Sequence, residues 1–245
     1  MVTCYDYTFA RLLSQSAIDA ILIGDSAAMV MHGHSSTINA ELELMRYHTA
    51  AVARGAGDKF LVADMPFLSF RKGISAALDT AHQLMRAGAH AVKLEGVDGH
   101  DDVIEAMTQS GIPVMGHLGL QPQSVHAYGG YKVQGRSEEQ AKEILRQARL
   151  LQHTGAFAVV LECIPTCLAK EITQELAIPT IGIGAGPHCD GQILVLQDML
   201  GMNLDFQPKF VRTFAQTGRG VIDALEEYNT AVKQGSFPSR KESYN

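Results

Sequence analysis

The sequence predicts an α/β protein built as a single (β/α)8 barrel, the TIM-barrel fold. Short, almost wholly apolar runs alternate with amphipathic segments along the chain, as buried parallel strands alternate with helices. One strand-like segment recurs further along the chain, which favours a closed ring over an open sheet whose halves meet at a switch point. A length of 245 residues suits one such barrel.

The predicted strands are the apolar runs, which are too short for buried helices. They are residues 20–25, 60–64, 91–95, 113–117, 158–162 and 180–184. Two further candidates lie near the ends of the barrel, at residues 2–4 and, more weakly, at 193–195. Together these segments supply the eight strands that the barrel requires.

The helices between the strands have recognisable ends. Ser137 followed by Gln140 predicts a capping box, in which each side chain accepts a hydrogen bond from the backbone N–H of the other residue. Apolar residues then recur at helical spacing until Gly155, which is expected to end the helix. Two other helices should also end at glycines: those near 41–54 and 74–87, at Gly55 and Gly88.

The repeated segment occurs in two quarters of the predicted barrel. Residues 88–95 (GAHAVKLE) match residues 155–162 (GAFAVVLE), and each copy is followed by a helix and an Ile-Pro pair that opens the next strand. Glu162 therefore occupies the same place as Glu95, two strands further round the ring. If Glu95 serves a metal, Glu162 is free to act as a general base.

Composition excludes several classes of function. A formal net charge of -6 and a pI near 5.9 argue against nucleic acid as a partner, and no apolar run is long enough to span a membrane. Four scattered cysteines are too few for a disulfide framework, so we expect reduced thiols in a cytoplasmic protein. We expect residues 1–235 to form one catalytic barrel domain and 236–245 a polar C-terminal tail.

Ionisable residues stand where the apolar strands end. These positions are Asp25, Asp64, Glu95, His117 and Glu162. Barrel enzymes gather their active-site groups at the carboxyl ends of the strands, although an acidic residue there can instead cap the following helix. Carboxylates brought together without partners repel one another, and a hard divalent cation relieves that repulsion. All-oxygen ligands favour Mg²⁺ over zinc.

Lys93 is the one lysine or arginine in these predicted strands, and it points to the same side as Glu95. A lysine inside a barrel needs an anion beside it, since burial of an unpaired charge is costly. Two interpretations remain open. Lys93 forms an internal ion pair with Glu95 or Asp64, or it contacts a carboxylate-bearing substrate beside the metal.

The chain resembles the ketopantoate hydroxymethyltransferase family in a series of motifs that run in order from residue 3 to about 235. The most specific is the long glycine-rich loop, residues 129–136 (GGYKVQGR). The others include Tyr5-Asp6-Tyr7, Gly24-Asp25-Ser26, Ala63-Asp64-Met65-Pro66-Phe67, Val92-Lys93-Leu94-Glu95-Gly96, Gly116-His117-Leu118-Gly119-Leu120, Pro122-Gln123-Ser124, Leu161-Glu162-Cys163-Ile164-Pro165, Gly182 through Gly186, Asp190-Gly191-Gln192 and Pro208-Lys209-Phe210.

The resemblance implies a Mg²⁺-dependent barrel of the phosphoenolpyruvate/pyruvate type. Such an enzyme moves a one-carbon unit from 5,10-methylenetetrahydrofolate to 3-methyl-2-oxobutanoate and yields 2-dehydropantoate in pantothenate biosynthesis. It also implies a homo-oligomer, since relatives form large rings that are often decamers. The implied metal site is Asp25 and Asp64, with Glu95 completing that environment. The implied oxo-acid contacts are Asp25, Ser26, Asp64 and Lys93, with His117 as a pocket residue and Glu162 as the proton acceptor.

Two other functions fit a barrel of this kind. One is a folate-independent C–C lyase acting on a 2-oxo or 2-hydroxy acid, which the folate dependence of turnover would separate from the transferase. The other is a non-catalytic barrel that serves as an assembly subunit, with its carboxylates acting only as helix caps. Titration with Mg²⁺ discriminates that case, because caps alone should bind no metal tightly.

Overall fold

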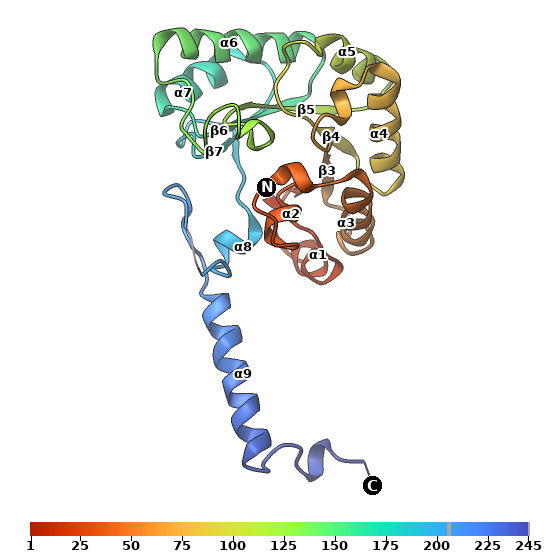
Figure 1. Cartoon of the computed structure of the whole chain (residues 1–245), viewed down its shortest axis with the longest axis vertical. Coiled ribbons are helices and arrows are strands. Elements are labelled where there is room, and N and C mark those ends of the chain that lie inside the picture. Colours follow the sequence, from red (N-terminus) through yellow and green to blue (C-terminus); the bar gives the residue numbers. More distant parts are fainter. Residues whose placement is uncertain (205–206, 245) are drawn as a thin grey trace. The chain divides into compact units, whose positions relative to one another are not determined.

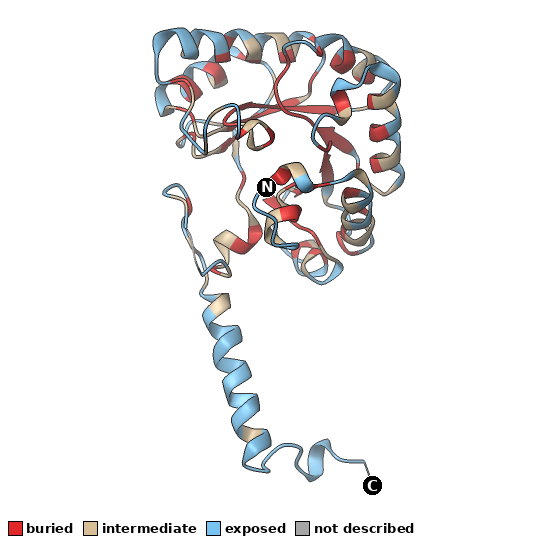
Figure 2. Cartoon of the chain, viewed as in Figure 1, coloured by how far each residue is buried: buried red, intermediate tan, exposed pale blue. Residues whose placement is uncertain are grey.

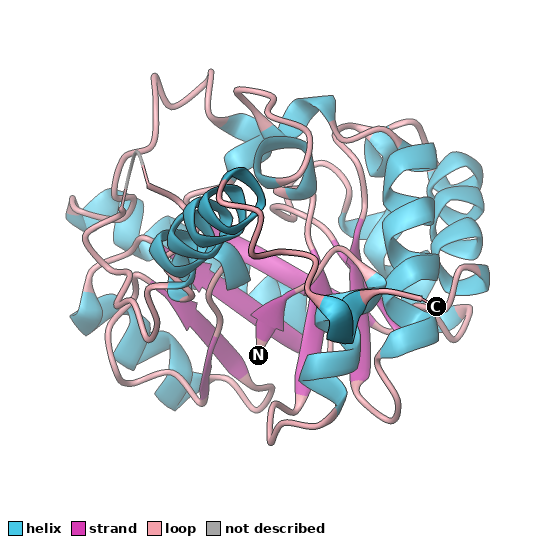
Figure 3. Cartoon of the chain, turned by 90° about the horizontal axis from the view of Figure 1, so that it is seen from below, coloured by secondary structure: helices cyan, strands magenta, loops and turns pink. Residues whose placement is uncertain are grey.

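The computed structural model describes residues 1–204 and 207–244, and the chain forms two compact units, Met1–Leu194 and Val195–Asn245. The first unit holds a parallel sheet whose strands follow one another in chain order, shown in magenta in Figure 3. In the described part of the chain these strands are β1 Val2–Thr3, β2 Ala20–Ile23, β3 Phe60–Asp64, β4 Ala91–Lys93, β5 Val114–Gly119, β6 Ala158–Glu162, β7 Thr180–Ile183 and β8 Gly191–Gln192.

The first strand meets the last. Val2 forms a parallel bridge with Leu194, just after β8, and the Thr3 N–H donates to the Leu194 carbonyl at 3.1 Å. The predicted (β/α)8 barrel is thereby confirmed. The last strand begins slightly earlier than predicted, because the Asp190 carboxylate accepts a hydrogen bond from the Thr180 N–H at 2.9 Å and brings this segment against β7.

Helices alternate with these strands on the outside of the first unit (Figure 1). They are α1 Tyr7–Ser14, α2 Ala27–Val30, α3 Leu42–Gly55, α4 Ile74–Arg86, α5 Asp101–Gln109, α6 Glu138–His153 and α7 Thr166–Glu175. Short 3-10 helices lie in the loops: η1 Thr37–Asn39, η2 Ser69–Arg71 and η3 Pro122–Ser124. Figure 2 shows the strands buried and the outer helices exposed on the side away from the sheet, as their amphipathic patterns predict.

The barrel interior is apolar in one layer and polar in the next. The apolar core cluster consists of Leu22, Val62, Ala91, Met115, Ala158, Val160 and Ile193. Two residues further along four of these strands stand Asp64, Lys93, His117 and Glu162. Because side chains on a strand alternate between faces, residues two apart share a face. The polar residues therefore line the same inner face, nearer the carboxyl ends of the strands.

Two of the predicted helix ends differ in detail from the expectation. The Ser137 side chain accepts from the Gln140 N–H at 3.3 Å as predicted, but the Gln140 side chain accepts from Arg136 instead of Ser137, so the capping box is incomplete. Gly55 is the last residue of α3, and a side chain there would meet the Tyr7 carbonyl at 2.7 Å. The close approach of α1 thus requires this glycine.

The sequence repeat corresponds to a repeated turn. Gly88 and Gly155 both have positive φ, 115° and 90°, and each follows a helix. In both copies the next residue closes the same six-to-one hydrogen bond, from Ala89 to Leu84 at 3.2 Å and from Ala156 to Leu151 at 3.1 Å. The repeat in the sequence thus sets how α4 and α6 turn into β4 and β6.

Gly88→Ala should destabilise the fold more than a similar substitution in open space. A Cβ at Gly88 would lie 2.4 Å from the Ala53 Cβ, whereas Gly111, with φ of 81°, has nothing within 4 Å. Backbone strain costs about 1–2 kcal/mol in either variant, and overpacking should add about 1–3 kcal/mol for Gly88→Ala alone. Urea unfolding followed by circular dichroism measures both. Equal losses would contradict the packing argument.

The second unit contains α8 Leu196–Met199, α9 Thr217–Lys233 and η4 Arg240–Glu242. No residue of α9 is buried, and exposed apolar side chains recur along it at helical spacing: Val221, Leu225, Tyr228 and Val232. Residues 236–244 are exposed, and Asn245 lies outside the described residues. The division into a catalytic domain at 1–235 and a tail at 236–245 stays a prediction. Among the described helices, none has the length and apolar character needed to cross a membrane.

Candidate active site

Lys93 and Asp64 form a buried ion pair at the centre of the polar layer. The two residues are register partners on β4 and β3, and Lys93 Nζ lies 2.7 Å from Asp64 Oδ1. Burial alone would lower the pKa of Lys93, but the carboxylates of Asp64, Asp25 and Glu95 raise it above its ordinary value. Lys93 is therefore a permanent cation, and the internal pair weighed from the sequence is present, with Asp64 as its partner.

Asp25 lies beside this pair, just after β2. Its backbone N–H donates to Asp64 Oδ2 at 3.0 Å, and its own carboxylate is buried. Burial, and then the negative charge of Asp64, raise the pKa of Asp25 to about 7. Burial followed by the charge of Asp25 also raises the pKa of Glu95 well above its ordinary value. The single ammonium of Lys93 thus does not compensate the carboxylates fully.

Gln123 connects two of these carboxylates, although no role was predicted for it. It lies in η3, the loop helix after β5, and its side-chain Nε2 donates to Asp25 Oδ2 at 2.9 Å. Its backbone N–H donates to Glu95 Oε2 at 3.0 Å. Sequence reasoning noted the Pro122-Gln123-Ser124 motif, but a glutamine in a turn gives no local signal that it is buried.

His117 links Lys93 to Glu162. Lys93 Nζ lies 3.3 Å from His117 Nδ1, and His117 Nε2 lies 3.1 Å from Glu162 Oε2. An ammonium can only donate, so Nδ1 is assigned as the acceptor and the ring proton is placed on Nε2, toward Glu162. Burial, and then the Lys93 charge, lower the pKa of His117, which keeps the ring neutral.

Glu162 is the most accessible carboxylate of the group. Its side chain is 15% exposed, whereas that of Glu95 is 3% exposed. Its backbone carbonyl accepts from the Leu120 N–H at 2.8 Å. The next residue, Cys163, adopts a left-handed backbone with φ of 47°, a strained conformation of the kind that clusters at functional sites. This turn was not foreseen from the sequence.

The glycine-rich loop, residues 129–136, is tied down beside Glu162. The Gln134 N–H donates to the Cys163 carbonyl at 2.9 Å. Earlier in the loop the Tyr131 hydroxyl lies 3.7 Å from Met29 Sδ, in α2. The loop thus reaches from the end of β6 to the segment that follows β2. Ser26, at the start of that segment, shares a 2.8 Å hydrogen bond with the buried Tyr5 hydroxyl.

The structure brings the predicted residues together. Contacts of 2.7–3.7 Å link Asp25, Asp64, Lys93, Glu95, His117 and Glu162, directly or through Gln123. None of the four acidic residues caps the helix that follows it, since the N-cap residues of α2, η2, α5 and α7 are Ser26, Leu68, His100 and Pro165. The helix-cap interpretation is therefore wrong for these positions.

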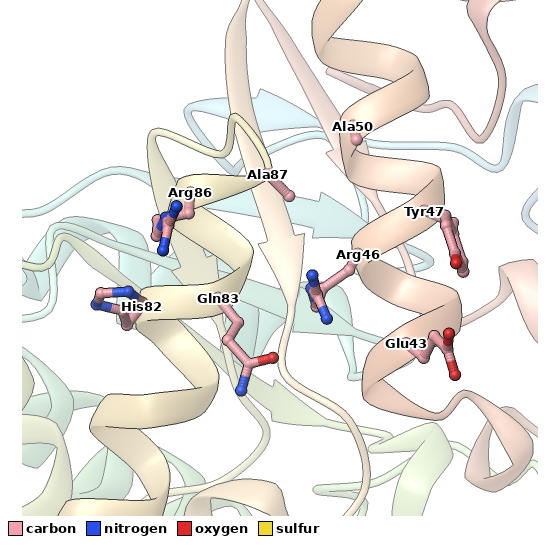
Figure 4. Close-up of a pocket in the computed structure, with 8 residues that line it drawn as sticks. All are labelled: Glu43, Arg46, Tyr47, Ala50, His82, Gln83, Arg86 and Ala87. Atoms are coloured by element: carbon pink, nitrogen blue, oxygen red, sulfur yellow. The ribbon is translucent and has the colours of Figure 1, made fainter.

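Two of the pockets outside this cluster are partly lined by charged residues. One of about 480 Å³ lies between α3 and α4, where Arg46 and Gln83 extend toward each other from opposite helices (Figure 4). None of the predicted site residues lines it. The other, of about 240 Å³, adjoins the carboxyl ends of β4 and β5, and its lining includes Gly96, Gly119 and Tyr128.

The donor chemistry of the cluster fits a hard divalent cation. Asp25, Asp64 and Glu95 offer buried oxygens, and Glu95 Oε1 has no hydrogen-bond partner among the described residues. As the side chains stand in the described part of the chain, no three His, Cys, Asp or Glu residues surround a common point. Mg²⁺ needs only one or two carboxylates, with waters and substrate oxygens completing its shell. Asp25 and Asp64 could supply those two.

The pKa of Asp25 makes the stability of the metal-free chain depend on pH. Because its folded pKa of about 7 exceeds the ordinary value of 3.8, the folded chain binds more protons between these values, and its stability falls as pH rises through this range. The lowered pKa of His117 makes stability rise with pH, which is the opposite effect. This effect is the same in the wild type and in a variant at Asp25. Asp25→Asn should therefore gain stability over the wild type as pH rises from 5 to 8. Urea midpoints in EDTA measure this, and a difference independent of pH would contradict it.

Comparison with known proteins agrees with these features. The profile of the ketopantoate hydroxymethyltransferase family matches residues 1–240. A 3-methyl-2-oxobutanoate hydroxymethyltransferase of Bdellovibrio bacteriovorus is 59% identical over 244 residues, covering 100% of this chain and 93% of the relative. The enzyme of the same name from Francisella tularensis subsp. tularensis is 52% identical, covering 100% and 92%.

A solved structure shows the same fold at low sequence identity. The 2,3-dimethylmalate lyase, described as a PEP mutase/isocitrate lyase superfamily member, has a TM-score of 0.59 and 19% identity, and the match covers 99% of this chain and 85% of the lyase. This likeness shows the barrel fold alone. With the family profile and the relatives matching over the whole barrel, the chain belongs to the ketopantoate hydroxymethyltransferase family.

Proposed function

We propose that this chain transfers a hydroxymethyl group from 5,10-methylenetetrahydrofolate to 3-methyl-2-oxobutanoate, yielding 2-dehydropantoate for pantothenate biosynthesis. The family and the names of its relatives support this reaction. The observation that carries it is the placement of Glu162, a partly accessible carboxylate beside a cluster of buried oxygen donors and one fixed ammonium. Such a cluster suits removal of a proton next to a keto group whose oxygens are held nearby.

Asp25 and Asp64 would hold Mg²⁺, with Glu95 completing that environment. When bound, Mg²⁺ supplies Lewis-acid polarisation to the keto and carboxylate oxygens of the oxo acid. Asp25, Ser26, Asp64 and Lys93 then contact the oxo acid. The raised pKa of Lys93 keeps it cationic, as pairing with the substrate carboxylate requires.

Glu162 accepts the proton from C3 of the oxo acid. The contact with His117 Nε2 engages Oε2 and leaves Oε1 to take the proton. The electron pair left on C3 forms the new bond to the methylene carbon of the folate as one of the two C–N bonds of that carbon breaks. Water displaces the second nitrogen from the same carbon and supplies the hydroxyl oxygen of the product. Both folate nitrogens keep the electrons of the broken bonds and take up one proton each, one from Glu162 and one from water.

A reconstituted assay tests this function. The purified chain is incubated with 3-methyl-2-oxobutanoate, methylenetetrahydrofolate and Mg²⁺, and 2-dehydropantoate is measured by mass spectrometry, with each component omitted in turn. We expect product only when all three are present. Consumption or cleavage of the oxo acid without folate would instead indicate the C–C lyase, and tight Mg²⁺ binding without any turnover would contradict the transferase.

We also propose a cytoplasmic homo-oligomer, with a decamer as the expected form. The four cysteines, all in the described part of the chain, are free thiols, which supports a reducing compartment. The exposed apolar residues of α9 support assembly, because such a stripe is normally covered. Sedimentation should therefore give a multiple of 26.5 kDa, and a monomer at micromolar concentration would contradict the proposal.

A further inference from the structure

Gln123 ties together the ends of four consecutive strands. Its Nε2 donates both to Asp25 Oδ2, after β2, at 2.9 Å and to the Met65 carbonyl, after β3, at 3.0 Å. Its backbone N–H donates to Glu95 Oε2, after β4, at 3.0 Å, and the residue itself follows β5. Gln123 is only 5% exposed. No other described residue forms hydrogen bonds to both Asp25 and Glu95 through its own side chain and backbone.

The contacts fix which way the amide points. If the amide were flipped, its oxygen would face the Met65 carbonyl, which can only accept. Both Nε2 protons are therefore used. The remaining atom, Oε1, is buried and has no hydrogen-bond partner among the described residues. A buried acceptor without a donor is costly, and a bound water or ligand that donates to Oε1 would remove that cost.

We propose that Gln123 is a positioning residue, which holds the carboxylates of Asp25 and Glu95 against their mutual repulsion in the arrangement that receives a divalent cation. The inference rests on the proposed Mg²⁺ dependence and deepens it. Asp25 and Glu95 both have raised pKa values, caused first by burial and then by neighbouring carboxylates. A neutral donor that binds one with its side chain and the other with its backbone restrains both without adding charge.

The test compares Gln123→Met, which keeps the length of the side chain, with Gln123→Ala. Both retain the backbone N–H to Glu95 and lose the donors to Asp25 and Met65. Outer partners of metal ligands change metal affinity by about 10–100-fold, so calorimetric titration with Mg²⁺ alone should show a loss of that size in each variant. Turnover should recover toward the wild-type kcat when Mg²⁺ is raised to saturation, which damage to the fold would not allow.

Gln121→Met is the matched control. Gln121 lies two residues earlier, beside Gly96, and none of the hydrogen bonds found among the described residues joins its side chain to Asp25 or Glu95. The Mg²⁺ affinity of the Gln121→Met variant should equal that of the wild type. A Mg²⁺ affinity in Gln123→Met equal to that of the wild type would overturn this inference but leave the proposed function standing. Failure of the wild-type chain to bind Mg²⁺ would instead remove the proposed metal dependence, and the inference with it.

Discussion

Glu162→Gln should lower turnover by about 10²–10⁴-fold, the usual contribution of a positioned general base. Glutamine keeps the size of the side chain and can still meet His117, but it cannot take a proton from C3 of the oxo acid. Binding of the oxo acid and Mg²⁺ should change little, because Glu162 contacts neither Asp25 nor Asp64 directly. The loss should therefore appear in kcat and not in KM.

Hydrogen exchange isolates this step from the rest of the reaction. In heavy water the wild type should exchange the C3 hydrogen of 3-methyl-2-oxobutanoate in the presence of Mg²⁺, and Glu162→Gln should not. Glu139→Gln, an exposed residue at the start of α6, is the matched control and should behave as the wild type. Undiminished exchange in Glu162→Gln would remove Glu162 from the role of base.

Asp25→Ala and Asp64→Ala should each weaken Mg²⁺ binding more than Glu95→Gln does. The first two remove a direct oxygen ligand of a cation that uses few protein ligands. Glu95 lies just after the next strand, β4, and its carboxylate accepts a hydrogen bond from the Gln123 N–H, so we expect it to bind a coordinated water and not the cation itself. Loss of such an outer partner costs about 10–100-fold. Calorimetric titration with Mg²⁺ ranks the variants, and Asp79→Ala on the exposed side of α4 is the control.

A second substitution at Asp64 is needed to separate metal binding from folding. Removing this carboxylate leaves Lys93 as a buried cation without its partner, and breaking a buried pair costs about 3–5 kcal/mol. Asp64→Asn keeps the shape and an oxygen that can face Lys93, so it separates lost metal binding from lost folding. A Mg²⁺-bound structure in which Asp25 or Asp64 turned away from the cation would defeat the assignment.

The sequence was sufficient to locate the strands and to predict that their polar ends converge. Apolar runs mark buried strands, and the two-residue period places Lys93 on the face of Ala91 and Glu162 on the face of Val160. Strand lengths were less certain, since β2 ends at Ile23 and β4 at Lys93. Backbone pairing, which decides where a strand ends, depends on the neighbouring strand and leaves no mark in the local pattern.

The partners inside the site were not predictable in the same way. Whether Lys93 pairs with Asp64 or Glu95 depends on the register of β3 against β4, which places Asp64 opposite Lys93. The role of Gln123 depends on how the loop after β5 folds back over the barrel. Glutamine is ordinarily a surface residue, so only the three-dimensional path of that loop shows that it is buried.

The polar layer above the apolar core implies a trade-off between activity and stability. Asp64, Lys93 and His117 occupy inward-facing positions that apolar side chains fill one layer below. Replacing a buried ion pair by well-packed apolar residues of similar volume is often neutral or stabilising by about 1–4 kcal/mol. Selection for thermal tolerance alone would therefore drive these positions toward leucine and methionine. Engineering of a more thermostable enzyme should leave this layer unchanged and place stabilising substitutions on the outer helices.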